Sequence, residues 1–340
     1  MKEDMNKARI AMIGAWGHGS GMLSYLEHSK PEFAEVVALA EVSPDEKFDN
    51  YRSRFEFLRS CPVYPDYRKM LDEVKPDIAV VSTALENLSE ATLAAASAGC
   101  AIYAEKPIAT TFELLDEIRQ AVEKNGSYLL FTMGNPSSPQ LCAIRELYES
   151  GQLGQIAVIN ARKSYPWNDD RVKQFPISLG GTIGWVGIHA LEFIYAATGK
   201  LFTKVGAMES NVRSENFAQC PDNTVMMFEL TGGGHASISV DYCRPKGRPV
   251  YGDDWIRVVG TMGIAEANMS RNTLRFTNNE TETYSLELPT PDEWFSLLPQ
   301  ALVLNQKVDY CTEMTQAAFE LNRTAIIAQQ AAVSGKILDI

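Results

Sequence analysis

The chain has 340 residues, of which 45% are hydrophobic and 22% charged, a balance typical of a globular protein. This length exceeds one ordinary core and predicts two domains. The formal net charge of −12 excludes nucleic acid and anionic membrane as main partners, because both attract basic surface. We see no run of about 20 apolar residues, so no membrane span is expected.

The N-terminus and the cysteines indicate a cytoplasmic protein. Residues 1–9 are polar and charged and lack the apolar core of a signal peptide. The six cysteines are scattered without a CxxC pair, which predicts reduced thiols. The four histidines are isolated, and no metal site is predicted.

A strand, a glycine-rich turn and a helix open the chain. The apolar run Arg9–Ile13 leads into residues 14–19 (GAWGHG), and a helical pattern begins at Met22. Such a turn brings backbone close to a pyrophosphate at a helix N-terminus. The spacing G-x-G-x-x-G places tryptophan at the middle glycine, and a turn that binds nothing is the alternative. The residues predicted to bind a dinucleotide here are Gly14, Trp16, Gly17, His18 and Gly19.

The second predicted strand, residues 36–40, ends in Glu41, which lies 22 residues beyond Gly19. An acid at this position accepts hydrogen bonds from ribose hydroxyls and repels a 2′-phosphate. We therefore expect NAD as the cofactor in preference to NADP. A solvated acid at a strand end is the alternative reading of Glu41.

Strands and helices alternate through the first part of the chain. Apolar strands over 77–83, 101–104 and 128–133 alternate with helical patterns over 89–99 and 110–124. The alternation predicts an α/β domain over residues 1–133, a doubly wound parallel sheet of the Rossmann type. Thr83 and Asn87 follow one strand, and we expect them beside the nicotinamide ribose.

Glu105, Lys106 and Pro107 follow the buried strand over residues 101–104. Ligands of such sheets bind at the carboxyl ends of the strands, where Lys106 falls. A lysine there can contact a substrate hydroxyl and stabilise an alkoxide. A surface Glu-Lys pair is the alternative.

A second domain is predicted over residues 134–340. Strand-like runs over 156–162, 224–230, 235–240 and 255–260 predict an α+β domain with a large, mostly antiparallel sheet. Between them lies a glycine-rich stretch, 180–187, and His189 at the start of a helix over 190–198. Histidine exchanges protons near neutral pH, although a structural histidine is the alternative.

Together these motifs resemble the glucose-fructose oxidoreductase / inositol dehydrogenase (Gfo/Idh/MocA) family over nearly the whole chain. The residues that carry the resemblance are the turn 14–19, Glu41, 105–107 (EKP), Gly180-Gly181, Gly187-x-His189 and the turn 260–263 (GTMG). The resemblance implies reversible hydride transfer between NAD(P) and a hydroxyl carbon of a sugar, inositol or related polyol. It implies that Lys106 holds the reacting oxygen, that His189 is the general acid/base, and that Glu105 positions the lysine and the nicotinamide ribose. It also implies a homo-oligomer, a dimer or tetramer.

The chain departs from the family pattern beside His189. The family usually has an aspartate four residues before the histidine, where this chain has Trp185. An indole there could stack on a sugar ring. A nearby polar-aromatic loop could supply the missing carboxylate from Asp169 or Asp170. The predicted substrate-binding residues are Lys106, Tyr165, Trp167, Asp169, Trp185 and His189.

Two other functions stay open on the sequence. One is an NAD-using glycoside hydrolase, since the family fold supports transient oxidation followed by elimination. The other is a catalytically degenerate dinucleotide-binding protein, because Trp16 and Trp185 replace an expected glycine and aspartate. A dehydrogenase accumulates NADH, which neither alternative does.

Overall fold

The structure, a computed structural model, describes residues 7–28, 33–43, 48–166, 168, 176–213, 219–245, 247, 252–280, 284–285, 288, 294–306 and 308–340. The chain divides into two compact units. Unit 1 comprises Met1–Gly134 and Glu293–Phe319, and unit 2 comprises Asn135–Asp292 and Glu320–Ile340. The first boundary between the units lies after Gly134, one residue beyond the predicted end of the first domain. The segment Glu293–Phe319, expected in the second domain, instead groups with unit 1.

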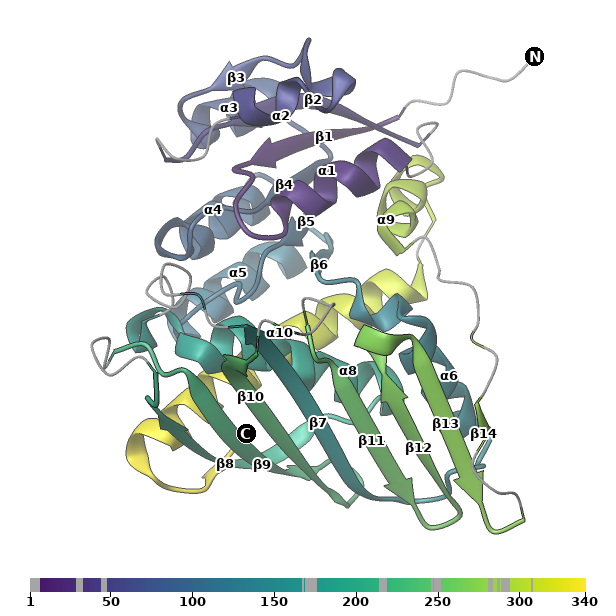
Figure 1. The fold of residues 1–340 in the computed structure, drawn as a ribbon. Coiled ribbons are helices and arrows are strands. Elements are labelled where there is room, and N and C mark those ends of the chain that lie inside the picture. The colour runs from purple at the N-terminus through teal and green to yellow at the C-terminus, as the bar shows by residue number, and fades with distance from the viewer. Residues whose placement is uncertain are drawn as a thin grey trace, which may run out of the picture. The chain divides into compact units, whose positions relative to one another are not determined.

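Unit 1 contains a parallel sheet with the strand order β3-β2-β1-β4-β5-β6 (Figure 1). Two halves wound outward from β1 give this order, which is the one found in dinucleotide-binding folds. The predicted doubly wound sheet is therefore confirmed. The strands are β1 (Ala8–Ile13), β2 (Ala34–Ala40), β3 (Val63–Tyr64), β4 (Ile78–Val81), β5 (Ala101–Ala104) and β6 (Leu129–Phe131).

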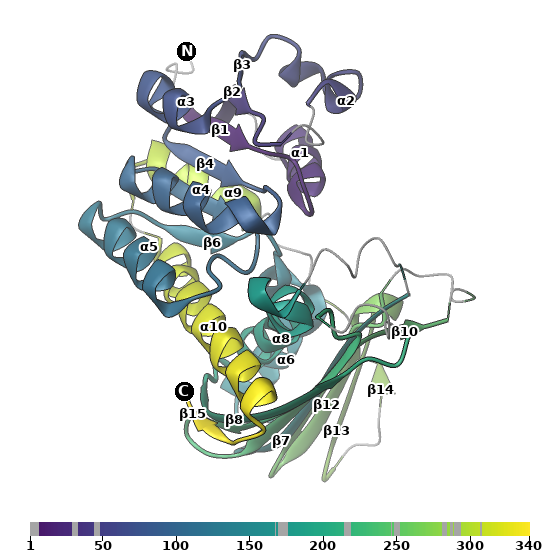
Figure 2. The ribbon, with the colours of Figure 1, turned by 90° about the vertical axis from the view of Figure 1, so that its left-hand side faces the viewer.

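Helices cover both faces of this sheet. In Figure 2, α4 and α5 lie on one face, whereas α1 and α9 pack on the other. The helices are α1 (Gly19–His28), α2 (Asp49–Arg52), α3 (Tyr67–Val74), α4 (Leu85–Ser97), α5 (Phe112–Lys124), α9 (Trp294–Val303) and the first part of α10 (Asp309–Ser334). Because both faces are covered, the central strands are apolar throughout, as β4 and β5 are.

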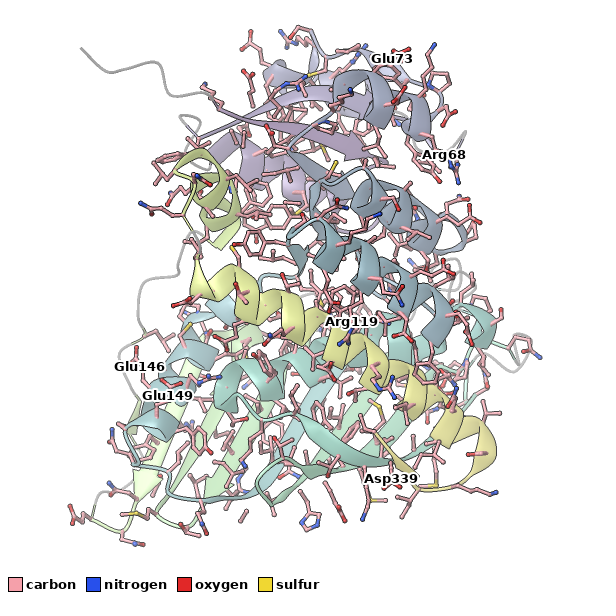
Figure 3. The ribbon with its side chains drawn as sticks, turned by 180° about the vertical axis from the view of Figure 1, so that it is seen from behind. Arg68, Glu73, Arg119, Glu146, Glu149 and Asp339 are labelled. Carbon is pink, nitrogen blue, oxygen red and sulfur yellow. The ribbon has the colours of Figure 1, made fainter. Side chains whose placement is uncertain are left out.

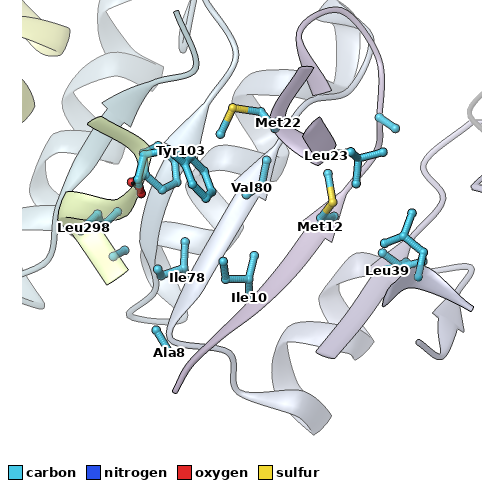
Figure 4. Packing of buried hydrophobic residues seen from close by; sticks show 14 of the residues in the cluster. Ala8, Ile10, Met12, Met22, Leu23, Leu39, Ile78, Val80, Tyr103 and Leu298 are labelled. Atoms are coloured by element: carbon cyan, nitrogen blue, oxygen red, sulfur yellow. Dashed lines mark hydrogen bonds between the residues drawn. The ribbon is translucent and has the colours of Figure 1, made fainter. Parts of the chain in front are cut away.

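The core of unit 1 explains why a distant segment joins it. Side chains of β1, β4, β5 and α1 form one buried cluster, to which α9 contributes Phe295 and Leu298 (Figure 4). The Tyr103 hydroxyl donates to the Phe295 carbonyl at 2.7 Å, and the two rings stack with centroids 4.6 Å apart. Fully burying one such side chain stabilises a fold by about 1.5–3 kcal/mol. These contacts hold residues 294–303 in unit 1.

Helix α10 contributes to both units. Its residues up to Phe319 belong to unit 1, where the Arg119 guanidinium of α5 lies 4.9 Å from the Phe319 ring centroid (Figure 3). Its residues from Glu320 onward belong to unit 2.

Unit 2 is built on a sheet with the order β14-β13-β12-β11-β7-β10-β9-β8-β15. Its strand pairs are antiparallel except for β7 with β10. The predicted large, mostly antiparallel sheet is confirmed. The strands are β7 (Ile156–Pro166), β8 (Phe202–Ser210), β9 (Asn223–Leu230), β10 (His235–Arg244), β11 (Trp255–Gly260), β12 (Gly263–Asn268), β13 (Thr273–Asn278), β14 (Tyr284–Ser285) and β15 (Leu338–Asp339).

Helices α6 (Pro139–Glu149) and α8 (Ile188–Thr198) pack on one face of this sheet (Figure 2). The opposite face alternates in exposure with the covered one along β9 and β10, and carries the exposed side chains of Met208, Val225 and Met227. We call it the open face.

The glycine-rich stretch before His189 is helical. Residues Ile183–Gly187 form a π-helix that continues directly into α8. By length and composition alone, Ile177–Thr198 would be apolar enough to cross a membrane, with a mean hydropathy of 1.3. However, 78% of the apolar 18-residue stretch within this segment is buried, as expected for a core helix of unit 2.

Candidate functional site

The glycine turn after β1 is held between two neighbouring strands. The Gly14 amide donates to the Ala40 carbonyl at the end of β2 at 2.9 Å. The Trp16 amide donates to the Ser82 carbonyl after β4 at 2.7 Å, and the Ser82 hydroxyl donates back to the Trp16 carbonyl. Gly14 has a φ of 74° and Gly17 a φ of 60°, which favour glycine. The backbone at Trp16 is thus docked on β4.

The glycines of this turn have separate roles. A Cβ at Gly19 would lie 2.7 Å from the Ser82 hydroxyl oxygen, so only glycine lets α1 begin this close to β4. Gly17 is exposed, whereas Trp16 is half-buried. The backbone available to a phosphate is therefore that of Gly17 and the start of α1, not that of residue 16.

Glu105 is the centre of a buried polar cluster in unit 1. Its Oε1 lies 2.7 Å from His18 Nδ1 and 3.1 Å from Lys106 Nζ. Its Oε2 accepts a hydrogen bond from the Thr132 hydroxyl at 2.6 Å. Glu105 is fully buried and Lys106 is 1% exposed. The structure thus brings His18, Glu105 and Lys106 together.

The charge on Glu105 follows from these partners. Burial alone would raise the pKa of its carboxyl group. The positive charges of His18 and Lys106 and the hydrogen bonds from His18 and Thr132 outweigh burial and lower this pKa to about 2. A buried, ionised carboxylate therefore lies directly against the Lys106 amine.

The other predicted cofactor residues lie at the same carboxyl edge of the sheet. Glu41 follows β2, and its Oε1 accepts from the Phe48 amide at 3.0 Å. Thr83 follows β4 and is fully buried, and Asn87 is half-buried in the first turn of α4. Helix α4 begins four residues earlier than the sequence pattern predicts, at Leu85. The turn, Glu41, Thr83 and Glu105 thus follow β1, β2, β4 and β5.

His189 has its own polar partners in unit 2. Its Nδ1 lies 3.4 Å from Asn135 Nδ2, and the same Asn135 nitrogen donates to Glu192 Oε2. The Glu192 carboxylate fixes the orientation of the Asn135 amide, because the amide oxygen would be repelled there. With an amide N–H directed at it, Nδ1 acts as the acceptor, so the neutral ring carries its proton on Nε2.

The predicted substrate-binding residues are described in part. Trp185 is 2% exposed within the π-helix, and Tyr165, at the end of β7, is 7% exposed. Beside Tyr165, the buried Lys163 pairs with Asp254, with Nζ to Oδ2 at 2.6 Å. Trp167, Asp169 and Asp170 lie outside the described residues.

Residue patterns missed four members of these clusters, and each had a signal in the sequence. Ser82 and Thr132 are the last residues but one of two predicted strands, and they contact the glycine turn and Glu105 respectively. Asn135 follows Gly134 at the domain boundary, and Glu192 lies three residues after His189 on the same helix face. Among the residues described, no group of three or more His, Cys, Asp or Glu side chains could hold a metal ion.

A doubly wound sheet of this order, with a glycine turn at its central strand, defines the N-terminal unit as a dinucleotide-binding Rossmann domain. The profile described as "Oxidoreductase family, NAD-binding Rossmann fold" matches residues 8–133, and that of the "GFO/IDH/MocA C-terminal domain" matches residues 142–266. The chain belongs to the GFO/IDH/MocA family of oxidoreductases.

Named relatives and solved structures agree with this membership. The D-glucoside 3-dehydrogenase of Escherichia coli (strain K12) is 27% identical over 62% of this chain and 62% of its own length. Levoglucosan dehydrogenase of Pseudarthrobacter phenanthrenivorans is 28% identical over 51% of this chain and 44% of its own length. The matched part of the chain thus spans about three fifths or less of the length of these relatives.

Among solved structures, one described as an oxidoreductase from Thermotoga maritima has a TM-score of 0.87 and 28% identity, and the match covers 98% of this chain and 100% of that one. Levoglucosan dehydrogenase in complex with NADH and levoglucosan has a TM-score of 0.80 at 18% identity. This match covers 98% of this chain and 100% of the levoglucosan dehydrogenase chain. The second likeness shows the fold alone.

Proposed function

We propose that this protein is an NAD-dependent dehydrogenase that transfers a hydride between NAD(H) and a hydroxyl carbon of a sugar, inositol or related polyol. The observation that carries the proposal is the contact of Glu105 with both Lys106 and His18 at the carboxyl edge of the Rossmann sheet. It joins the candidate catalytic amine to the glycine turn expected to hold the cofactor. The glucoside and levoglucosan dehydrogenases among the relatives support a sugar-type substrate.

The chemistry assigns one role to each side chain. The nicotinamide, when bound, accepts or returns the hydride. The Lys106 ammonium, whose Nζ lies 3.1 Å from Glu105 Oε1, stabilises the alkoxide that develops at the reacting oxygen. His189 takes the hydroxyl proton during oxidation and returns it during reduction.

NAD is the proposed cofactor in preference to NADP. Glu41 places a carboxylate after β2, where it would bond ribose hydroxyls and repel a 2′-phosphate. The hydrogen bond from the Phe48 amide to its Oε1 supports this side chain at the sheet edge. The free energy of binding should therefore favour NADH over NADPH.

We also propose a cytoplasmic homo-oligomer, a dimer or tetramer. All six cysteines are free thiols, and Cys61, Cys100, Cys220 and Cys311 are buried, which fits a reducing compartment. The exposed Met208, Val225 and Met227 on the open face support contact with a second copy. Sedimentation velocity of the purified protein measures its subunit number.

The function is tested by turnover and by one isosteric substitution. Protein would be screened with NAD and NADP against sugars and polyols, following absorbance of the reduced nicotinamide. Lys106→Met keeps the volume of the side chain and removes its charge. We expect turnover to fall by about 10²–10³-fold while NAD affinity changes little, since one stabilising donor is lost.

Lys124→Met removes an exposed lysine at the end of α5 and is the matched control. Turnover of the Lys106→Met variant equal to that of the control would rule out the proposed role. Product release without NADH accumulation would indicate a glycoside hydrolase. Tight NAD binding without turnover on any compound would indicate the degenerate binding protein.

A further inference from the structure

Glu209 of β8 is a half-buried acid of unit 2 that the proposed reaction does not use. Along β8 it follows the exposed Met208, so its side chain lies on the face of the sheet away from the open face. Its Oε2 accepts a hydrogen bond from Gln329 Nε2 of α10 at 2.6 Å. The pair therefore ties β8 to the part of α10 that belongs to unit 2.

Two buried oxygen atoms of this pair lack a donor. Neither Glu209 Oε1 nor Gln329 Oε1 has a hydrogen-bond partner within the described part of the chain. A side-chain amide carries a donor and an acceptor next to each other, and here only the donor is used. Because buried polar atoms are rarely left unpaired, the arrangement requires one more donor.

The surroundings of Glu209 disfavour its ionised form. The residues that face it are neutral, since Thr224 stands opposite it on β9 and Gln329 contacts it from α10. Lys204 of β8 pairs instead with Glu229 of β9. Burial raises the pKa of the Glu209 carboxyl group, and the hydrogen bond from Gln329 offsets this effect only in part. The pKa is not shifted by the other charged residues of the neighbouring elements, which are Asp222, Glu320, Arg323, Lys336 and Asp339.

The Gln329 amide also packs against a turn on the way to His189. Gly181 has a φ of 58°, and a Cβ at this position would lie 2.7 Å from Gln329 Oε1. Two residues later the π-helix Ile183–Gly187 begins, and it continues into α8. A displacement of the Gln329 amide would therefore disturb the turn that precedes the π-helix.

We propose that Glu209 carries a proton in the folded protein and forms a reciprocal pair with the Gln329 amide, and that this pair is a pH-sensitive support of the turn at Gly181. The protonated Oε1 of Glu209 donates to Gln329 Oε1 while Oε2 accepts from Nε2, so both buried oxygens gain a partner. On ionisation the proton passes to solvent and the first of these bonds is lost. The support is independent of the proposed dehydrogenase function, because neither Lys106 nor His189 takes part in the pair.

The raised pKa of Glu209 determines the sign of the pH dependence. The stability that its protonated form contributes is fully present below the ordinary value of 4.5 and is lost as the pH rises through the folded-state pKa. Glu209→Gln is the test variant, because a second amide offers the same donor and acceptor at every pH.

Infrared difference spectra between the wild type and Glu209→Gln isolate this carboxyl group. We expect a protonated-carboxyl band that titrates with a midpoint above 4.5. A midpoint at or below 4.5 would overturn the proposal, because another donor would then satisfy the two oxygens. Glu146→Gln removes the same charge from an exposed position of α6 (Figure 3), and this control should follow the wild type in every measurement.

Thermal unfolding and hydrogen exchange of the full chain test the effect on the turn. Above the midpoint, Glu209→Gln should unfold about 2–4 °C higher than the wild type, since it keeps the bond that ionisation removes. Backbone amides of residues 177–187 should then exchange about fivefold faster in the wild type than in this variant. Below the midpoint the two proteins should behave alike. Equal exchange at every pH would show that the pair does not support the turn.

Glu209→Met removes the charge and cannot form the pair, so it separates these two effects. Below the midpoint it should unfold at a lower temperature than both the wild type and Glu209→Gln, because both bonds are lost. A methionine variant as stable there as the glutamine variant would contradict the reciprocal pair.

Discussion

Glu105 links the charge state of one residue to the stability of unit 1. Its folded-state pKa of about 2 lies below the ordinary value of 4.5, so its ionised form stabilises the fold. That contribution is fully present above the unfolded pKa and is lost as the pH falls from about 4.5 toward 2. The shift corresponds to about 3 kcal/mol at neutral pH.

Glu105→Gln should remove this pH dependence. The amide keeps the shape but leaves the buried Lys106 without its carboxylate, so we expect unfolding free energy to fall by about 3–5 kcal/mol at pH 7. The difference from wild type should shrink as the pH falls toward 2. Urea unfolding between pH 2 and 7 measures both. Glu90→Gln, at an exposed acid that pairs with Arg68, is the control. A Glu105→Gln variant as stable as this control at pH 7 would show that the Glu105 carboxylate does not stabilise the fold.

The contacts of His189 predict which nitrogen of its ring carries the proton. We expect the wild-type ring to carry its proton on Nε2, because Asn135 directs an N–H at Nδ1. The exchange variant Asn135→Asp with Glu192→Gln retains the number of charges but places an acceptor beside Nδ1. Its ring should become protonated on Nδ1, because the new carboxylate accepts a hydrogen bond from that nitrogen.

Imidazole ¹⁵N–¹H correlation spectra distinguish the two tautomers, and His189→Gln identifies the signals of this ring among those of four histidines. A wild-type ring already protonated on Nδ1 would show that the Asn135 contact does not set the tautomer. Glu149→Gln, at an exposed acid of α6, is the matched control, because it removes one carboxylate and leaves Asn135 and Glu192 in place.

At the scale of elements, the sequence pattern predicted what local periodicity determines. The run Trp255–Gly260 has the bounds predicted for it, and β5 ends at Ala104, directly before the Glu-Lys pair. The helical state of 183–187 could not be predicted, because glycines usually indicate a loop and only packing in unit 2 offsets their cost. The hydrogen bond between Asn135 and Glu192 could not be predicted either, because it depends on the tertiary packing of unit 2 and no sequence spacing connects the two residues.

Gly260 shows how closely one element end depends on its neighbours. A Cβ at Gly260 would collide with the carbonyl oxygen of Leu153 and lie 2.8 Å from its carbonyl carbon. Since this obstacle is backbone, we expect Gly260→Ala to lower the unfolding free energy by about 3 kcal/mol. Thermal unfolding measures the loss. Gly21→Ala in α1, where nothing lies within 4 Å, should instead be neutral or gain up to about 1 kcal/mol. Equal effects of the two substitutions would be inconsistent with the steric argument.

At the scale of the whole molecule, the division of the chain goes beyond what a linear pattern predicts. The boundary after Gly134 coincides with the change from alternating strands and helices to strand-rich sequence. The segment Glu293–Phe319 belongs to unit 1 because Phe295 and Leu298 pack into its core. Phe295 contacts Tyr103 of β5, which lies 192 residues earlier in the sequence. Such long-range packing leaves no local signal.

The sharing of α10 between the units leads to a prediction about cooperativity. Residues 309–319 of this helix belong to unit 1 and 320–334 to unit 2, so unfolding of either unit should shorten a helix that the other unit uses. We expect one calorimetric transition, with equal calorimetric and van't Hoff enthalpies. NADH at about 100 times its Kd should stabilise the folded chain by about 2.7 kcal/mol and shift the whole transition upward. NADPH at the same concentration is the control and should shift it less if Glu41 has its proposed role of repelling the 2′-phosphate. Two transitions, of which NADH moves only one, would show that the units unfold independently despite the shared helix.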